Sequence, residues 1–352
     1  METILIPQAD TIPVSWGWFQ FLLLLTFPLH LLAMNAMFGG LVIGVSQHLN
    51  GGQVQQRLAH RIAVVTPLLI ALVVNLGVAP FLFLQVLYGQ FVYTSSILMG
   101  LFWILVIPVL ILAYAGGYLY DFRFEGLGRF GILVGVFCCL SFLAIAAMFS
   151  NNMLLMVQPA QFHEYFDAMA GTLLLAGDVQ FWPRYLHMVI SALAIGGLAV
   201  ALLGRFRAGR DLHLADHATG LGLRLFWILT LVNIPVGALF LVNLPREQML
   251  LFMGGNMGAT VAFSVGLLLT IGAVITAIRH RLWLTIIHVV ALVYVMVFMR
   301  AWLRSSYLGD YFTLDRLELV PQYSPMIFFF VTLGVGVVLL GWLWKVTAKA
   351  MA

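Results

Sequence analysis

The sequence predicts an all-α integral membrane protein, a single transmembrane domain of about nine helices covering residues 1–352. Hydrophobic residues make up 63% of the chain and charged residues only 9%, with a mean hydropathy of +1.05. Soluble domains carry about 25% charged residues, so most of this chain belongs in a bilayer. Apolar runs long enough to cross the hydrocarbon recur from end to end. The predicted spans are residues 16–46, 62–83, 92–119, 129–149, 182–204, 222–243, 257–278, 283–303 and 325–345.

The basic residues predict which ends of the spans face the cytoplasm. With the N-terminus outside, twelve of the 17 Lys and Arg fall in cytoplasmic loops or in the tail, and most acidic residues fall outside. Cytoplasmic loops are enriched in Lys and Arg, so we expect an N-out, C-in topology. The net charge of +4 then reflects topology, and nucleic-acid binding is not expected.

The loops and cysteines exclude some classes of site. Residues 150–181 and 304–324 form the two longer outer segments, and no tandem repeat or soluble domain stands out. Cys138 and Cys139 are adjacent within the fourth span and are expected to be packing residues. No Cys-x-x-Cys-His motif occurs, which excludes covalent attachment of a c-type haem.

Three histidines lie within spans that carry almost no other ionisable group: His30, His187 and His288. An imidazole in hydrocarbon needs a hydrogen bond, a cavity or a metal, and imidazole is a common axial ligand of haem iron. His187 lies about five residues into the fifth span, and Met257 opens the seventh, which runs in the same direction. Both are expected near the outer face, where a His–Met pair would suit a low-spin haem.

The other histidines occupy different depths. His30 lies some fourteen residues into the first span, about 20 Å along the helix axis, and is expected nearer mid-membrane. His288 lies near the inner end of the eighth span, where it is expected to be structural and to reach toward the cytoplasm. Four more are expected in loops or helix ends and solvated: His48, His60, His213 and His217. From the residues alone, helix packing and haem ligation both remain open for each intramembrane histidine.

The order of several motifs resembles subunit I of the cytochrome bd family of quinol oxidases. The segment ending in Thr26-Phe-Pro-Leu-His30 resembles the family's first helix, and Tyr185-Leu-His187 through Gly196-Gly197 resembles its histidine helix. Two shorter matches lie between them, at Asn75–Gln85 with Tyr88-Gly-Gln-Phe and at Met156-Val-Gln-Pro159. The resemblance covers about residues 16–245 and implies nine helices in a bacterial inner (cytoplasmic) membrane.

The resemblance implies b-type haem, one or two and non-covalent. By it, His187 would ligate low-spin haem with Met257, His30 would ligate a second haem, and Arg300 would neutralise a haem propionate. Several family features are missing. The long outer loop after the sixth helix is absent, the third span has no carboxylate, and Met299-Arg300-Ala-Trp302 is the nearest equivalent of the GRQPW signature. Val297 stands where the family has a haem-ligating glutamate.

Three functions follow as hypotheses. The first is a b-haem subunit of a respiratory complex, moving electrons between the quinone pool and a c-type cytochrome or second membrane subunit, without standard oxygen reduction. A quinone would dock near the outer end, where hydrogen-bonding side chains are Asn75, Gln85, Gln90 and Gln158. The second is an active bd-like terminal oxidase using a haem at His30. The third is a haem-free transporter or scaffold subunit, although no matching pair of interrupted helices is visible.

Small residues predict where helices approach each other. Gly39 in the first span and Gly196 and Gly197 in the fifth are expected to let these two helices pack closely.

Overall fold

The computed structural model describes residues 5–351 except 168, 208 and 210. The described chain contains nine helices long and apolar enough to cross a membrane, and its only β-contact is an isolated bridge between Ile12 and Leu319. The predicted all-α, multi-pass architecture is therefore confirmed.

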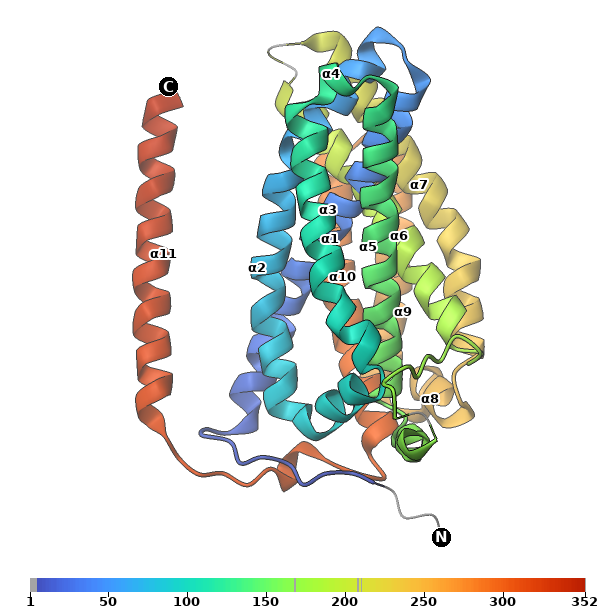
Figure 1. The fold of residues 1–352 in the computed structure, drawn as a ribbon, viewed down its shortest axis with the longest axis vertical. Helices are drawn as coiled ribbons and strands as arrows, with labels where there is room; N and C mark the ends of the chain where they lie inside the picture. The colour runs from blue at the N-terminus through green and yellow to red at the C-terminus, as the bar shows by residue number, and fades with distance from the viewer. Residues whose placement is uncertain (1–4, 168, 208, 210, 352) are drawn as a thin grey trace.

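Eight of these helices form two four-helix groups (Figure 1). In each group the helices contact one another around a ring, and helices α1 and α6 join the two groups. The first group contains α1 (Trp16–Asn50), α2 (Gln53–Leu98), α3 (Gly100–Phe122) and α5 (Arg129–Leu155). The second contains α6 (Phe181–Arg207), α7 (Leu212–Val242), α9 (Met257–Ile278) and α10 (Leu282–Leu308).

The contact between α1 and α6 depends on glycine. A Cβ placed on Gly39 would collide with the backbone of Ala192 and Gly196, and one placed on Gly196 would collide with the backbone of Gly39. The two backbones therefore touch, as predicted for this pair. Gly197 differs from the prediction, because it faces the carbonyl oxygen of Gly222 in α7 instead of α1.

Helix α2 continues through the gap that was predicted between the spans 62–83 and 92–119. Helical hydrogen bonding continues to Leu98, and α3 begins only at Gly100. Between the two predicted spans the structure has a bend in one helix and not a loop. At this bend Tyr88 has non-helical dihedral angles (φ −138°, ψ 31°). The apolar sequence on both sides supports a helix, so Pro80 and Gly89 did not end it.

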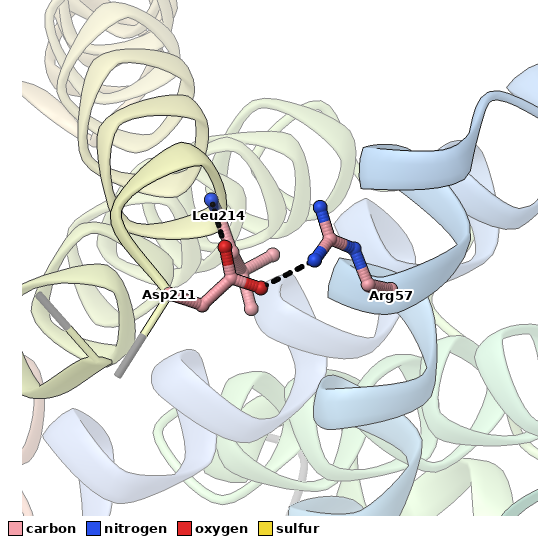
Figure 2. Close-up of polar contacts among 3 residues, drawn as sticks. All are labelled: Arg57, Asp211 and Leu214. Atoms are coloured by element: carbon pink, nitrogen blue, oxygen red, sulfur yellow. Dashed lines mark hydrogen bonds and ion pairs between the residues drawn. The ribbon is translucent and has the colours of Figure 1, made fainter.

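Helix α7 also begins earlier than the predicted residue 222. Asp211 caps its N-terminus by accepting a hydrogen bond from the backbone N–H of Leu214 (3.1 Å), and Arg57 of α2 pairs with the same carboxylate at 2.6 Å (Figure 2). A capping aspartate fixes where a helix starts, which the hydropathy pattern did not reveal.

Short elements close the two ends of the bundle. At the lower end in Figure 1 lie η1 (Pro159–Phe166), α8 (Arg246–Leu250), η2 (Leu251–Gly255) and η3 (Leu314–Arg316). At the upper end lies α4 (Phe124–Leu127). The segments predicted to share the outer face thus share one end of the molecule.

Helix α11 (Tyr323–Met351) stands apart from the bundle (Figure 1). The N-terminal segment hydrogen-bonds the chain that leads to it, with the N–H of Ile12 donating to Glu318 (2.8 Å) and that of Val320 donating to Ile12 (3.0 Å). No residue in its most apolar stretch of 18 residues is buried. A helix that is apolar all round can be satisfied by lipid alone, so it need not join the compact bundle.

Candidate functional site

A cavity of about 440 Å³ lies beside α1, where the two helix groups meet. Its lining comes from α1, α2, α3, α5, α6 and α10 and is mostly apolar. This volume falls within the usual range for cofactor pockets, about 300–1,000 Å³. The charged and titratable side chains in the lining are His30, Arg184, Tyr185, Arg300 and Arg304.

His30 borders this cavity in a geometry suited to metal ligation. Its Nδ1 lies 3.1 Å from the carbonyl oxygen of Val73 in α2, and its ring lies against Gly77, one turn further along that helix. Donation of the Nδ1 proton to a backbone carbonyl fixes the tautomer and leaves the lone pair of Nε2 for a ligand. A Cβ on Gly77 would approach the His30 ring to 2.8 Å, so glycine makes the space for this ring.

Arg300 lines the same cavity as His30, and Phe27 connects the two side chains. The Arg300 guanidinium lies 5.2 Å from the centroid of the Phe27 ring, which in turn stacks on His30 at 6.4 Å between ring centroids. The structure therefore brings together two of the four predicted site residues.

His187 lies outside this lining, on the face of α6 that meets α7. Its ring lies against Gly237, where a Cβ would come within 3.0 Å of the imidazole, and it stacks on Phe240. Its Nδ1 is buried with no hydrogen-bond partner among the described residues. A buried polar atom without a partner is unusual, and a ligand is one way to satisfy it.

Met257 is the first residue of α9, and 79% of it is exposed. Asn256 caps this helix by accepting a hydrogen bond from the N–H of Ala259 at 3.0 Å, which explains why the predicted start at 257 is correct. Helices α6 and α9 lie diagonally in the second group, with α7 and α10 between them. The pairing of Met257 with His187 stays a prediction.

His288 has a local partner. Its Nδ1 lies 2.7 Å from the carbonyl oxygen of Leu284 in its own helix, and its ring packs against Gly272 of α9. These contacts suit the structural role expected for it.

A second pocket of about 560 Å³ lies at the end of the bundle opposite the three arginines, and its lining includes His48 and His60. His48 was expected to be solvated, but it is only 6% exposed, and its Nδ1 lies 3.0 Å from the hydroxyl of Tyr120. Phe124 stacks between His48 and His60, at 4.5 and 4.8 Å between centroids. His217 lies outside this pocket and is half-buried, with its Nε2 2.8 Å from the side-chain oxygen of Gln47.

The proposed quinone contacts are dispersed. Asn75 donates to the carbonyl oxygen of Ala71 in its own helix, Gln90 is buried, and Gln158 donates to the carboxylate of Asp178. No single pocket described here collects these side chains.

The residues around His30 fit a haem better than a free metal ion. Within the described part of the chain, no group of three or more His, Cys, Asp or Glu is placed to hold a metal ion. Haem iron needs only one or two axial ligands from the protein, together with an apolar cavity and partners for two carboxylates. His30, the apolar lining and the arginines meet these needs.

Sequence reasoning did not name Arg184 and Arg304 as site residues, although both line the cavity. For Arg184 the signal was available, since it lies within the predicted span 182–204. Arg304 was placed at the start of the outer segment 304–324, and only the structure shows that α10 continues past it to Leu308. Intramembrane charges mark functional sites more often than they mark packing.

Comparison with known proteins does not extend this description. No family model matches the chain, and no curated protein matches it either.

Proposed function

We propose that this chain is a b-type haem subunit of a respiratory complex in a bacterial inner membrane, with its N-terminus outside and its C-terminus in the cytoplasm. It would carry electrons between the quinone pool and a partner, either a c-type cytochrome or a second membrane subunit. The observation that carries this proposal is His30, whose Nδ1 meets the Val73 carbonyl at the edge of an apolar cavity that also contains Arg300.

Each residue has a distinct role in this proposal. His30 presents Nε2 to iron, while the Val73 carbonyl holds the proton on Nδ1. Arg300 neutralises a propionate, and the apolar lining excludes water. His187, with Met257, would hold a second haem of low-spin type. Bound haem supplies reversible one-electron oxidation and reduction of its iron.

The proposed topology rests on the distribution of the basic residues. The basic residues predict an N-out chain, and the loops assigned to each side gather at opposite ends of the bundle (Figure 1). The arginine-bearing end of the cavity is then the outer end, close to the side on which an external partner would dock.

The proposal is tested by purifying the full chain in mild detergent and recording a reduced-minus-oxidised spectrum with a pyridine haemochrome assay. We expect a b-type α band. In His187→Ala we expect loss of the low-spin component, because the imidazole that would ligate the iron is removed. His288→Ala is the matched control, since the His288 ring already bonds its own helix. Purified protein without haem would overturn the proposal and favour the transporter or scaffold.

A bd-like terminal oxidase is the second candidate, and the apolar lining around His30 favours it because molecular oxygen is a small apolar oxidant. Against it, no carboxylate is among the described residues of that lining. Oxygen consumption by reconstituted protein, with a quinol or reduced cytochrome c as donor, separates the two candidates. Activity that persists in His30→Ala would exclude His30 as its site.

A further inference from the structure

Three arginines border one end of the His30 cavity: Arg184, Arg300 and Arg304, called here the arginine cluster. Arg184 lies in the first turn of α6, whereas Arg300 and Arg304 are one turn apart near the end of α10. Side chains four residues apart share one face of a helix, so α10 presents two guanidinium groups in the same direction. All three line a cavity whose other walls are mainly apolar.

The described part of the chain supplies no carboxylate to this cluster. The two ion pairs among the described residues are Arg57–Asp211 and His163–Glu164, and neither includes a residue of the arginine cluster. Aromatic rings take the place of acids, since Arg300 lies over Phe27 at 5.2 Å and Arg304 over Tyr88 at 4.7 Å. The Nε of Arg304 is buried without any hydrogen-bond acceptor in the described chain.

Asp178 is the acid nearest to Arg184 in the described sequence, and its two oxygens are already engaged. One accepts a hydrogen bond from the side chain of Gln158 at 2.9 Å, and the other from the backbone N–H of Gln180 at 2.8 Å. The side chain of Gln180 in turn accepts a hydrogen bond from Tyr307. This network holds the Asp178 carboxylate in the loop before α6, and the ion pairs of the described residues include none between Asp178 and Arg184.

Three cations around one apolar cavity repel each other and lack the hydration they would have in water. Cation–π contacts compensate only part of this cost, because ring faces are weaker partners than carboxylates. An anion that enters the cavity would relieve both the repulsion and the missing hydrogen bonds. Arginine also binds carboxylates through two parallel hydrogen bonds, which gives the interaction direction as well as strength.

We infer that Arg184 and Arg304 are cofactor-binding residues that act with Arg300 as a clamp for the two carboxylates of one amphipathic macrocycle. This inference rests on the proposed haem function and names the groups that would hold the edge of the haem. A dicarboxylate fits three arginines better than a monoanion does, because two negative charges leave one positive charge instead of two. Phe27, which contacts both His30 and Arg300, places the iron ligand and the clamp on one side of the same cavity.

The test compares two ligands that differ only at the carboxylates. Full-length chain produced in a haem-deficient host is placed in lipid nanodiscs and titrated with ferric protohaem or with its dimethyl ester, following the Soret band. We expect the free acid to bind at least tenfold more tightly than the ester. In Arg184→Gln and in Arg304→Gln we expect the affinity for the acid to fall toward that for the ester, which should change little.

Arg246→Gln is the matched control, because Arg246 is exposed at the start of α8 on the same end of the molecule. It should keep the full preference for the acid. The comparison of acid with ester uses the unchanged chain, so it holds even where a variant fails to fold.

The outcomes separate the two proposals. Equal binding of acid and ester would overturn the clamp while leaving the haem function intact. Binding of neither ligand would overturn the haem function, and the clamp with it. A preference for the acid that survives in the Arg184→Gln/Arg304→Gln double variant would remove these two residues from the clamp.

Discussion

His30 and His48 lie on the same helix and almost the same face, yet their surroundings differ. Eighteen residues separate them, which is five helical turns and about 27 Å. His48 meets the hydroxyl of Tyr120, stacks on Phe124 and is nearly fully buried. His30 bonds a single backbone carbonyl and borders an apolar cavity with three arginines.

The two ends of the bundle differ in whether the protein itself supplies hydrogen-bond and charge partners for its polar side chains. At the end of the bundle that holds His48, the chain satisfies its own groups: histidine meets tyrosine, and Arg57 meets Asp211 (Figure 2). At the other end, the arginine cluster has no acid among the described residues, and Nε of Arg304 has no acceptor there. Polar groups whose partners lie within the fold stabilise it, whereas buried polar groups without a partner indicate a ligand site.

Replacing the two histidines should separate these roles most clearly. If the proposed haem binds in the cavity, we expect His30→Ala to lose it almost completely, because the proposed ligand nitrogen is gone, and His48→Ala to keep it. The measurement is haem per protein by pyridine haemochrome after purification. Equal loss in both variants would mean that His30 has no special role.

Gly77 packs against the ring of His30 and Gly131 against the ring of His48, so substitutions at these glycines compare the two sites with a smaller change. A methyl group on Gly77 would lie 2.8 Å from the His30 ring, and one on Gly131 would lie 3.3 Å from the His48 ring. We expect Gly77→Ala to displace His30 and to weaken haem binding roughly tenfold, since overpacking typically costs about 1–3 kcal/mol. Gly131→Ala should bind haem normally, and Soret titration of both variants checks this. Normal binding by Gly77→Ala would show that the His30 position is not constrained by α2.

Tyr120→Phe tests whether the His48 end of the bundle stabilises the fold. Removing the hydroxyl leaves Nδ1 of His48 buried without its partner, which typically costs about 1–3 kcal/mol. We expect a lower midpoint of denaturant unfolding in detergent, with the haem spectrum unchanged. A changed spectrum at full stability would instead assign His48 and Tyr120 to the cofactor.

The smallest effect is expected at the Arg57–Asp211 pair. Half of the Arg57 side chain is exposed, and such pairs contribute at most about 1 kcal/mol. Asp211→Ala also removes the cap of α7 and should cost about 1 kcal/mol more, whereas Asp211→Asn keeps a capping oxygen and should cost less. Unfolding midpoints of the two variants compare cap and ion pair. A larger loss in Asp211→Asn than in Asp211→Ala would contradict the assignment.

Hydropathy predicted the nine spans because a bilayer imposes a minimum length of apolar helix, and the structure contains them. The same pattern could not locate helix ends such as that of α7, where one capping carboxylate decides the start. Nor could it tell a bend from a loop at Tyr88, since both interrupt the regular pattern without changing hydropathy.

The sequence by itself determined the membrane class, the number of spans and the few polar side chains within them, because these follow from composition and local spacing. Only the tertiary structure decided that His30 shares a cavity with Arg184, Arg300 and Arg304, while His48 meets Tyr120. These neighbours come from helices far apart in the chain, and their meeting depends on how α1, α2, α6 and α10 pack. Whether a buried histidine is a structural group or a ligand is set by those neighbours, which no local pattern records.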